Sequence, residues 1–447
     1  MGAAGKLTSI EVLISNGAAM RKRNLLIAAL SATVVACSAA AVIMWEPTLA
    51  SVPAPPVSSS DSQTRIYGAR VVALGDCFVC HTTKGGKPFA GGLPLETPFG
   101  TIYSTNITPD AATGIGSWSL EAFTRAMRRG IARDGHQLYP AFPYLHFTRM
   151  SDGDIAAAYA YLMSLDPVEA KAPDNDLIFP LNFRPLVAFW NVLFLKPGEQ
   201  KPEPSASAEW NRGRMLVDGP GHCAACHSPL NLIGGEKSGK AFGGGLVDGW
   251  EAPALDALGS AVVPWTKAQL VTYLRTGRAS EHGAAAGPML PVTQELAAVP
   301  VSDVEAIATY ILSIQKPGTV AAMQPVSNVG RPPEGDSVRR GEALFNAACA
   351  ACHGNGAPMQ AIGGRPGLTS STAVNARSPR NVIQMMMNGV PWQGAGSIHF
   401  MPLFSESLRD DQLADLAGYL RAAYSREPAW TEVAKMVSEI RMENNSR

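Results

Sequence analysis

Three short frames with the same pattern, Cys-x-x-Cys-His, constrain this chain more than any other feature of its sequence. They use six of the seven cysteines: Cys77, Cys80, Cys223, Cys226, Cys349 and Cys352. A histidine directly follows each second cysteine: His81, His227 and His353. Two thiols three positions apart can each add to a vinyl group of one porphyrin, and the adjoining imidazole can then bind the iron. The frames therefore predict three covalent haem c groups.

Other uses of paired cysteines fit less well. An exported chain can carry disulfides, and a Cys-x-x-Cys pair can belong to a thioredoxin-type redox site or to half a zinc site. A redox pair needs no following histidine and belongs to a strand-helix-strand pattern, which does not surround these frames. A zinc site would need a second pair of ligands at a set spacing, which three separated frames do not supply.

The frames head three similar segments, so self-comparison indicates one unit used three times. In each unit a short helix precedes the frame, at residues 66–75, 210–217 and 338–348. A Gly-rich loop follows, then a middle helix that closes at Gly130, Gly277 or Gly389. A capped helix ends each unit, at residues 151–162, 302–312 and 409–420, with Ser-x-x-Asp/Glu openings at Ser151 and Ser302 that predict capping boxes. We expect an all-α fold of three tandem cytochrome c-like domains, each stapled by its haem.

This organisation predicts the domain boundaries. The ranges are 1–19 a dispensable extension, 20–50 a signal or membrane anchor, 51–62 a linker, 63–175 the first haem domain, 176–206 an aromatic segment and linker, 207–316 the second haem domain, 317–335 a Pro-rich linker, 336–425 the third haem domain and 426–447 a tail. Pro-rich connectors of this kind behave as semi-rigid spacers. In the 176–206 segment, Phe183, Phe189, Trp190 and Phe194 predict either an extra helix on the first unit or a surface for another subunit or the membrane interface.

The N-terminus carries an export signal. The basic cluster Arg21, Lys22 and Arg23 precedes an apolar stretch long enough to span a bilayer, and Met20 is a candidate start. A retained anchor is the preferred interpretation. A lipid on Cys37, which ends a lipoprotein-like box, and cleavage near Ala50 are the alternatives. All three leave the bulk of the chain outside the cytoplasm, at the periplasmic face of a bacterial cytoplasmic membrane.

A sixth iron ligand is expected in the loop between the middle and terminal helices. A methionine there raises the reduction potential and closes the iron, which suits electron transfer. Met401 is preferred over His399 in the third unit, and Met289 over His282 in the second.

The first unit departs from this pattern, because Phe142 takes the place of the methionine. His146 is the first choice for its sixth ligand and Met150 the second, with an open iron as a third possibility. We interpret His136 and His222 as structural histidines.

With these residues in hand, the chain resembles the cytochrome c subunits of bacterial membrane-bound dehydrogenases over residues 65–425. The resemblance is most specific in GGLPLETPFG from Gly91, IYSTNITP from Ile102 and LYPAFPY from Leu138. Phe142, the nearby histidine and the run FPLNFR from Phe179 look like the members that accompany molybdenum-cofactor aldehyde or N-heterocycle dehydrogenases, with aldehyde preferred. The resemblance implies a catalytic dehydrogenase partner, allows a small iron–sulfur subunit beside it, and implies ubiquinone or a terminal oxidase as acceptor.

These observations predict an electron-transfer subunit that is no enzyme on its own. The alternatives are a multihaem peroxidase-type enzyme, which would need an open iron, and a free-standing redox shuttle. Formal net charge is +0, so no global charge points to nucleic acid. The Gly-rich loops follow the frames instead of joining a strand to a helix, so they are poor phosphate cradles.

Overall fold

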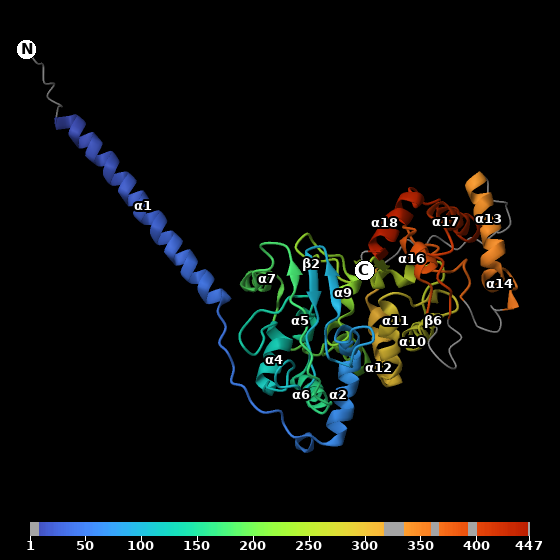
Figure 1. Cartoon of the computed structure of the whole chain (residues 1–447), viewed down its shortest axis with the longest axis horizontal. Helices are drawn as coiled ribbons and strands as arrows, with labels where there is room; N and C mark the ends of the chain where they lie inside the picture. Colours follow the sequence, from blue (N-terminus) through green and yellow to red (C-terminus); the bar gives the residue numbers. More distant parts are fainter. Residues whose placement is uncertain (1–8, 317–334, 359–365, 392–399, 446–447) are drawn as a thin grey trace, which may run out of the picture.

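A computed structural model describes residues 9–316, 335–358, 366–391 and 400–445 of the chain. One long helix, α1 (Ser9–Met44), projects away from a helix-rich body (Figure 1). The body contains three groups of helices, and each group surrounds a hydrophobic cluster of its own. These groups are called the first, second and third units below, in chain order.

Each unit has the three helices expected from the sequence. The helices that precede the frames are α2 (Ser62–Leu74), α8 (Ala208–Asp218) and α13 (Asp336–Ala348). The middle helices are α4 (Leu120–Arg129), α10 (Lys267–Thr276) and α16 (Arg380–Asn388). The terminal helices are α6 (Asp152–Leu162), α12 (Val301–Ser313) and α17 (Asp410–Tyr424). In every unit the first and last of these helices pack against each other.

A glycine at the same place in each unit allows this packing. The three are Gly68, Gly213 and Gly341. A Cβ on any of them would lie only 1.9 to 2.1 Å from a backbone carbonyl oxygen of the terminal helix, and less than 3 Å from the Cβ of a tyrosine one turn on. The backbones of the two helices therefore meet at a contact that admits no side chain.

Helix ends follow the sequence signals in part. Gly130, Gly277 and Gly389 close the middle helices with positive φ, as expected. Ser151 forms the predicted capping box with Asp154. The capping box predicted at Ser302 is wrong, because α12 begins one residue earlier, after Pro300. Pro300 is the N-cap residue, and it has no side-chain oxygen with which to cap the helix.

The all-α expectation missed several short strands. Strands β1 (Pro94–Thr97), β2 (Gly100–Tyr103) and β3 (Asp176–Leu177) form an antiparallel sheet in the first unit. Antiparallel pairs in the second unit are β4 (Gly245–Val247) with β5 (Trp250–Ala252), and β6 (Arg278–Ala279) with β7 (Gly283–Ala284). Segments of two to four residues are too short for a period-2 pattern to stand out in the sequence, so the sequence gives little sign of them.

The remaining helices are short or lie at the edges of the units. They are α3 (Cys77–Cys80), α5 (Tyr144–Phe147), α7 (Val187–Phe194), α9 (Cys223–His227), α11 (Met289–Ala297), α14 (Ala350–His353) and α18 (Val433–Asn445), with 3₁₀ turns at Val57–Ser59, Arg184–Leu186 and Leu255–Ser260. The segment expected as a tail thus contains α18, which buries Val437 and Ile440 completely in the third cluster.

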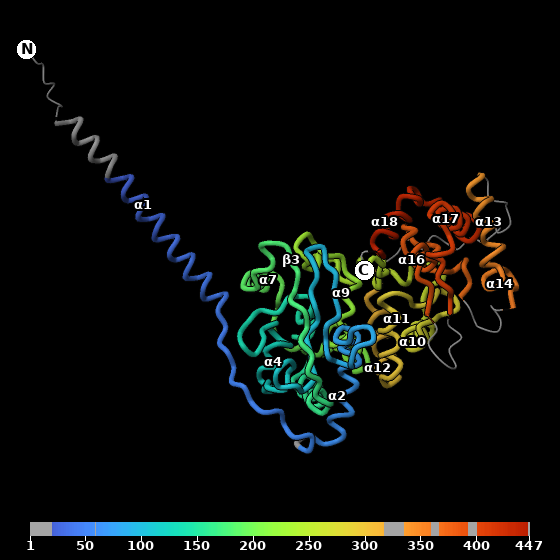
Figure 2. Tube along the Cα trace, in the orientation of Figure 1, coloured from blue at the N-terminus to red at the C-terminus, as the bar shows by residue number. Residues whose placement is uncertain are grey.

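Two of the connecting segments pack against the first unit. Figure 2 traces the extended segment from α1 to α2 along the outside of the first unit. The residues between α7 and α8 are held too, since Gln200 donates its N–H to the carbonyl of Arg149. Most of the Pro-rich linker predicted at 317–335 lies outside the described residues.

Candidate haem sites

Each Cys-x-x-Cys-His frame lies on or next to a single helical turn. The turns are α3, α9 and α14, and all seven cysteines of the chain are free thiols. Within a frame the two cysteines are three residues apart, so on a helical turn their thiols lie on one face. No disulfide competes for them, and the arrangement fits two thioether bonds to one porphyrin.

The histidines of the first two frames are held in one tautomer. Nδ1 of His81 lies 2.6 Å from the carbonyl oxygen of Thr105, and Nδ1 of His227 lies 2.7 Å from that of Pro253. A carbonyl oxygen only accepts, so Nδ1 carries the proton and the lone pair is on Nε2. Burial lowers the pKa of both imidazoles, and the carbonyl contact offsets part of that effect. A neutral ring with a free Nε2 is the form that binds a metal.

Sequence reasoning missed Thr105 and Pro253. Thr105 lies two residues after β2, and Pro253 directly follows β5, so the short hairpins position both carbonyls. A backbone acceptor leaves no side-chain signature. The only signal was positional, because Thr105 falls within the IYSTNITP run that carries part of the family resemblance.

One cavity of about 900 Å³ lies between the second and third units. The frame residues Cys223, Cys226, His227, Cys349 and His353 line it together with many apolar side chains. The second and third frames therefore open into one shared space. An apolar cavity with cysteine pairs and imidazoles at its wall fits a covalently held haem.

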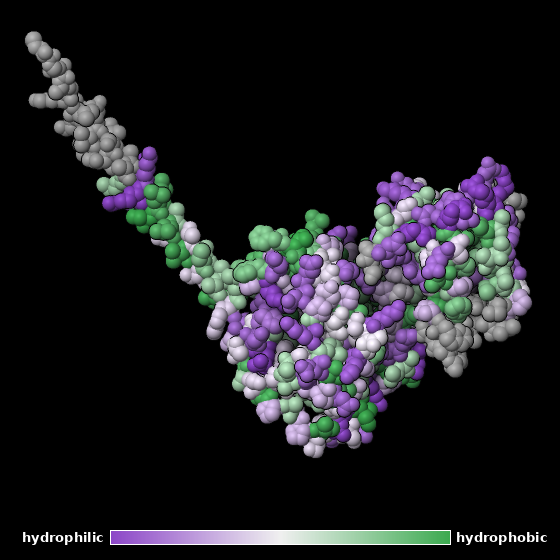
Figure 3. Space-filling model, viewed as in Figure 1, coloured by the Kyte–Doolittle hydropathy of each residue, from purple (hydrophilic) through white to green (hydrophobic). Residues whose placement is uncertain are grey.

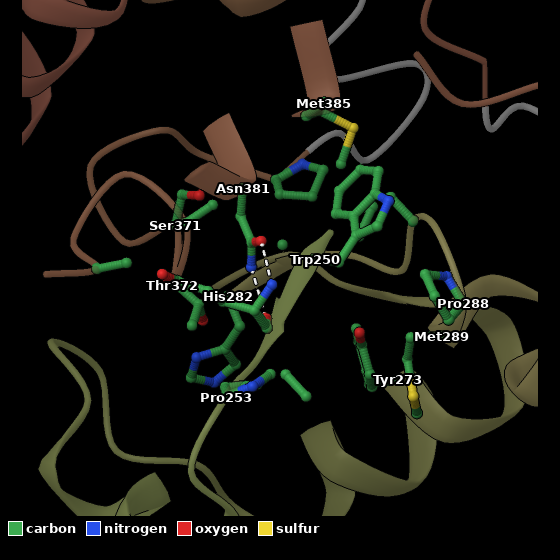
Figure 4. Close-up of a pocket in the computed structure, with 18 of the residues that line it drawn as sticks. Trp250, Pro253, Tyr273, His282, Pro288, Met289, Ser371, Thr372, Asn381 and Met385 are labelled. Carbon is green, nitrogen blue, oxygen red and sulfur yellow. Dashed lines mark hydrogen bonds between the residues drawn. The ribbon is translucent and has the colours of Figure 1, made fainter. Parts of the chain in front are cut away.

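Met289 and Met401 both line this cavity. Met289 is the first residue of α11, and Figure 4 shows it beside Tyr273 on the wall formed by the second unit. Met401 is held by a backbone bridge to Val390, with N···O distances of 2.9 and 3.0 Å. Either thioether can serve as a sixth ligand, which remains a prediction for both.

The histidine alternatives differ. His282 is 1 % exposed and its ring stacks on Trp265 with centroids 3.6 Å apart, so it packs in the second unit. It also lines the cavity, and its buried Nδ1 has no hydrogen-bond partner among the described residues, so it stays the alternative to Met289. Its neighbours in the cavity wall appear in Figure 4. His399 lies outside the described residues.

The two predicted sixth ligands of the first unit are deeply buried: His146 is 4 % exposed, and Met150 is 1 % exposed within the first cluster. Phe142, which takes the place of the methionine, is half-buried and packs on Phe147 with ring centroids 5.4 Å apart. His146 directs Nε2 at a carboxylate oxygen of Glu236, 2.7 Å away in the second unit. Burial raises the pKa of Glu236, but its hydrogen bond with His146 and the charge of Arg149 contribute to lowering it overall.

This contact leaves one nitrogen of His146 available. Since the carboxylate accepts from Nε2, the neutral ring has its lone pair on Nδ1, which is buried with no hydrogen-bond partner among the described residues. An orphaned, buried nitrogen of this kind fits a metal ligand, so ligation by His146 stays a prediction, with Met150 as the second choice.

The first and second frames lie near each other. Burial is the main cause that raises the pKa of Cys80 to about 12 and that of Cys226 to about 11, and the carboxylates of Asp76 and Asp248 contribute to both shifts. His222, which precedes the second frame, has Nε2 3.3 Å from the carbonyl oxygen of Gly75, which closes α2 of the first unit. Burial lowers the pKa of His222 to about 4, so this ring is neutral.

Comparison with known proteins agrees with this geometry. The cytochrome c family matches residues 66–166, and the family described as cytochrome c oxidase, cbb3-type, subunit III matches residues 336–420. The chain is 48 % identical over 408 residues to a nicotinate dehydrogenase subunit of Pseudomonas putida, a match that covers 90 % of this chain but spans about a third (34 %) of that longer protein.

Two other relatives are matched over most of their own length. The gluconate 2-dehydrogenase cytochrome c subunit of Pantoea cypripedii is 37 % identical over 84 % of this chain and 88 % of its own. The fructose dehydrogenase cytochrome subunit of Gluconobacter japonicus is 34 % identical over 87 % of this chain and 85 % of its own. With its frames, oriented imidazoles and apolar cavity, the chain belongs to the family of cytochrome c subunits of membrane-associated dehydrogenase complexes, which bind haem c and transfer electrons.

Proposed function

We propose that this chain binds three haem c groups and carries electrons from a partner dehydrogenase to ubiquinone or a terminal oxidase. The observation that carries the proposal is the threefold frame, with imidazoles in the first two units oriented for iron by Thr105 and Pro253. Haem iron supplies reversible one-electron chemistry, and the protein tunes it through its ligands and surroundings.

The side chains around the frames do three things. The cysteine pairs would hold the porphyrin, the backbone carbonyls of Thr105 and Pro253 aim Nε2 of His81 and His227, and the apolar wall would exclude water. Met289 and Met401 would close the second and third irons, which favours a high potential. His146 would give the first iron two nitrogen ligands and a lower potential.

The second unit is the middle of the proposed electron path. Its frame lies near the first frame through Cys80 and Cys226, and it shares a cavity with the third frame. Electrons entering at either end would therefore reach the other end through the second unit.

The partner's substrate is an aldehyde or an aromatic N-heterocycle in this proposal. The sequence features favour an aldehyde-oxidising molybdenum enzyme, with a possible iron–sulfur subunit. The relative named as a nicotinate dehydrogenase subunit supports the N-heterocycle. Anaerobic addition of an aldehyde or of nicotinate to the purified complex should reduce the haems with one of them. Reduction by neither would contradict both assignments.

Helix α1 would tether the chain to the periplasmic face of the cytoplasmic membrane. Its Met20–Met44 portion is apolar, long enough to cross a bilayer and unburied. The alternative, a lipid on Cys37, would place that exposed thiol at the chain's N-terminus after cleavage.

Redox titration of Met289→His and Met401→His variants tests the ligands. We expect each to lower one of three midpoint potentials by roughly 0.1–0.3 V, within the range of about 0.8 V that axial ligands span. The matched control is Met163→Leu, which should leave all three potentials in place, because Met163 is a core residue of the first cluster and no predicted ligand. If the unmodified reduced protein binds carbon monoxide, an open iron is present and the peroxidase-type alternative gains support.

A further inference from the structure

The segment that follows α1 is docked on the first unit. The N–H of Leu49 donates to the carbonyl of Arg133 (2.8 Å), Thr48 Oγ1 donates to the carbonyl of Asp134 (2.8 Å), and Arg125 donates to the carbonyl of Pro47 (2.6 Å). Helix α1 also contacts α7. These contacts fix the orientation of the first unit relative to the end of α1.

An apolar surface lies on that same side of the molecule. We name it the α7 patch, and its exposed members come from two segments: Ile178, Phe179, Leu181, Phe183, Phe189, Val192 and Leu193 of the first unit, and Leu230, Leu232 and Ile233 of the second. Phe179 is 83 % exposed and Leu232 is 96 % exposed. Figure 3 shows apolar side chains gathered on this side of the body, next to the end of α1.

The two segments of the α7 patch are joined. The indole N–H of Trp190 donates to the carbonyl of Ile233 at 2.9 Å. The ring of Phe194 lies so close to Gly235 that a Cβ there would be 2.4 Å from it. The patch is therefore one held surface across the first two units, and its exposure does not come from loose loops.

Its composition matches a lipid interface. Between residues 178 and 195 the only charged side chain is that of Arg184, which lies over the ring of Tyr139, and residues 228–235 carry no charge. Exposed Lys196 and Lys237 come just beyond these segments. Exposed Asp176 and half-buried Glu236, whose carboxylate pairs with His146, also border them. Apolar and aromatic side chains bordered by lysines are typical of surfaces at the headgroup level. A soluble surface rarely leaves such a patch uncovered.

We propose that the α7 patch lies in the headgroup region of the same bilayer that α1 spans, so that the first two units rest on the membrane surface. This rests on α1 being retained as an anchor. The segment after Glu46 is docked on the first unit, so the end of α1, and with it the edge of the bilayer, lies next to that unit. The contact of α1 with α7 places the same edge next to the α7 patch. Lipid is favoured over a partner subunit because the patch adjoins a helix that is itself apolar and unburied.

Spin labels on the full-length haem-loaded chain in lipid vesicles test the proposal. The background is Cys37→Ser, since haem occupies the other six cysteines. Labels go on Leu193→Cys and, independently, on Phe179→Cys. Met442→Cys is the matched control, because Met442 is an apolar residue of α18 with 65 % exposure, close to the 67 % of Leu193. Collision rates with oxygen, which enters lipid, and with a water-soluble nickel chelate are measured for each label.

In vesicles, we expect the oxygen-to-nickel collision ratio at positions 193 and 179 to exceed the ratio at position 442 several-fold. After proteolysis has released the haem domains from α1 into detergent-free buffer, the ratios at the three positions should match. Equal ratios in vesicles that carry the chain would overturn the patch proposal alone. Labels immobilised only when the dehydrogenase subunits are present would assign the patch to a partner protein. A chain that does not float with the vesicles would remove the anchor and the patch together.

Discussion

The two junctions between the units are built differently. At the first junction side chains of the two units meet directly: Leu74 of α2 packs in the second unit's cluster, and the ring of Phe147 meets that of His222 edge-on with centroids 5.5 Å apart. Leu74 and His222 also reach one end of the large cavity. At the second junction the units face each other across the large cavity lined by both frames. Hydrogen bonds also join the two units there: Asn381 and Glu251 exchange two of them. Side-chain packing can therefore stabilise the first junction by itself, whereas the stability of the second junction depends on what occupies the cavity.

Removing the third haem should have the largest effect. In a Cys349→Ser/Cys352→Ser variant we expect the number of covalent haems to fall from three to two. We also expect the third unit to detach from the second, because the cavity between them loses one of the haems that would fill it. The intact mass gives the number of covalent haems. The radius of gyration from X-ray scattering shows whether the third unit stays docked on the second.

The matched control is Cys77→Ser/Cys80→Ser, which also removes one haem but leaves the packed first junction. Its radius of gyration should stay close to that of the unmodified protein. An equal expansion in both variants would contradict the contrast between the junctions.

Disrupting the packing at the first junction should lower the free energy of unfolding by less than removal of a haem does, but still substantially. Leu74→Ala deletes a side chain that is 5 % exposed and belongs to the neighbouring unit's core. Such a deletion costs about 2–5 kcal/mol of unfolding free energy through lost burial and the cavity left behind. Chemical denaturation measures it, with Leu120→Ala, which is 41 % exposed, as the control expected to change stability little.

The first junction also holds the residue expected to make the protein acid-sensitive. Burial lowers the pKa of His222 to about 4, whereas an ordinary histidine titrates near 6.5. In the unfolded chain the imidazole of His222 binds a proton below about pH 6.5, whereas in the folded protein it binds one only below about pH 4. Stability therefore falls as the pH drops through that window, by up to about 3 kcal/mol.

His222→Asn should flatten this loss. Asparagine tolerates the positive φ of 34° at this position and does not titrate. Denaturation midpoints between pH 4 and 7 measure the slope, and an unchanged slope in the variant would show that another group is responsible.

Sequence reasoning could predict much of each unit but little of either junction. The frames, the nine long helices and the closing glycines follow from local signals, such as the positive φ of Gly130 and Gly277. The carbonyls that orient His81 and His227 belong to backbone brought close by short hairpins, which no local pattern reveals. The contact of His146 with Glu236 spans two units, so it depends on how the units pack. Helix α18 was missed as part of the third core because its burial is visible only in the folded chain.

The smallest expected effect is at the polar edge of the cavity junction. Asn381 donates to the carbonyl of Glu251 at 2.8 Å and accepts from its N–H at 2.9 Å, bonds drawn in Figure 4. Asn381→Ala should cost about 1–2 kcal/mol, because two partly buried backbone groups lose their partner. Asn381→Asp should cost more, since a carboxylate still accepts from the N–H but repels the carbonyl. Denaturation of the two variants gives the order, and the reverse order would mean that water replaces the side chain at this junction and that the haem-filled cavity alone holds the third unit.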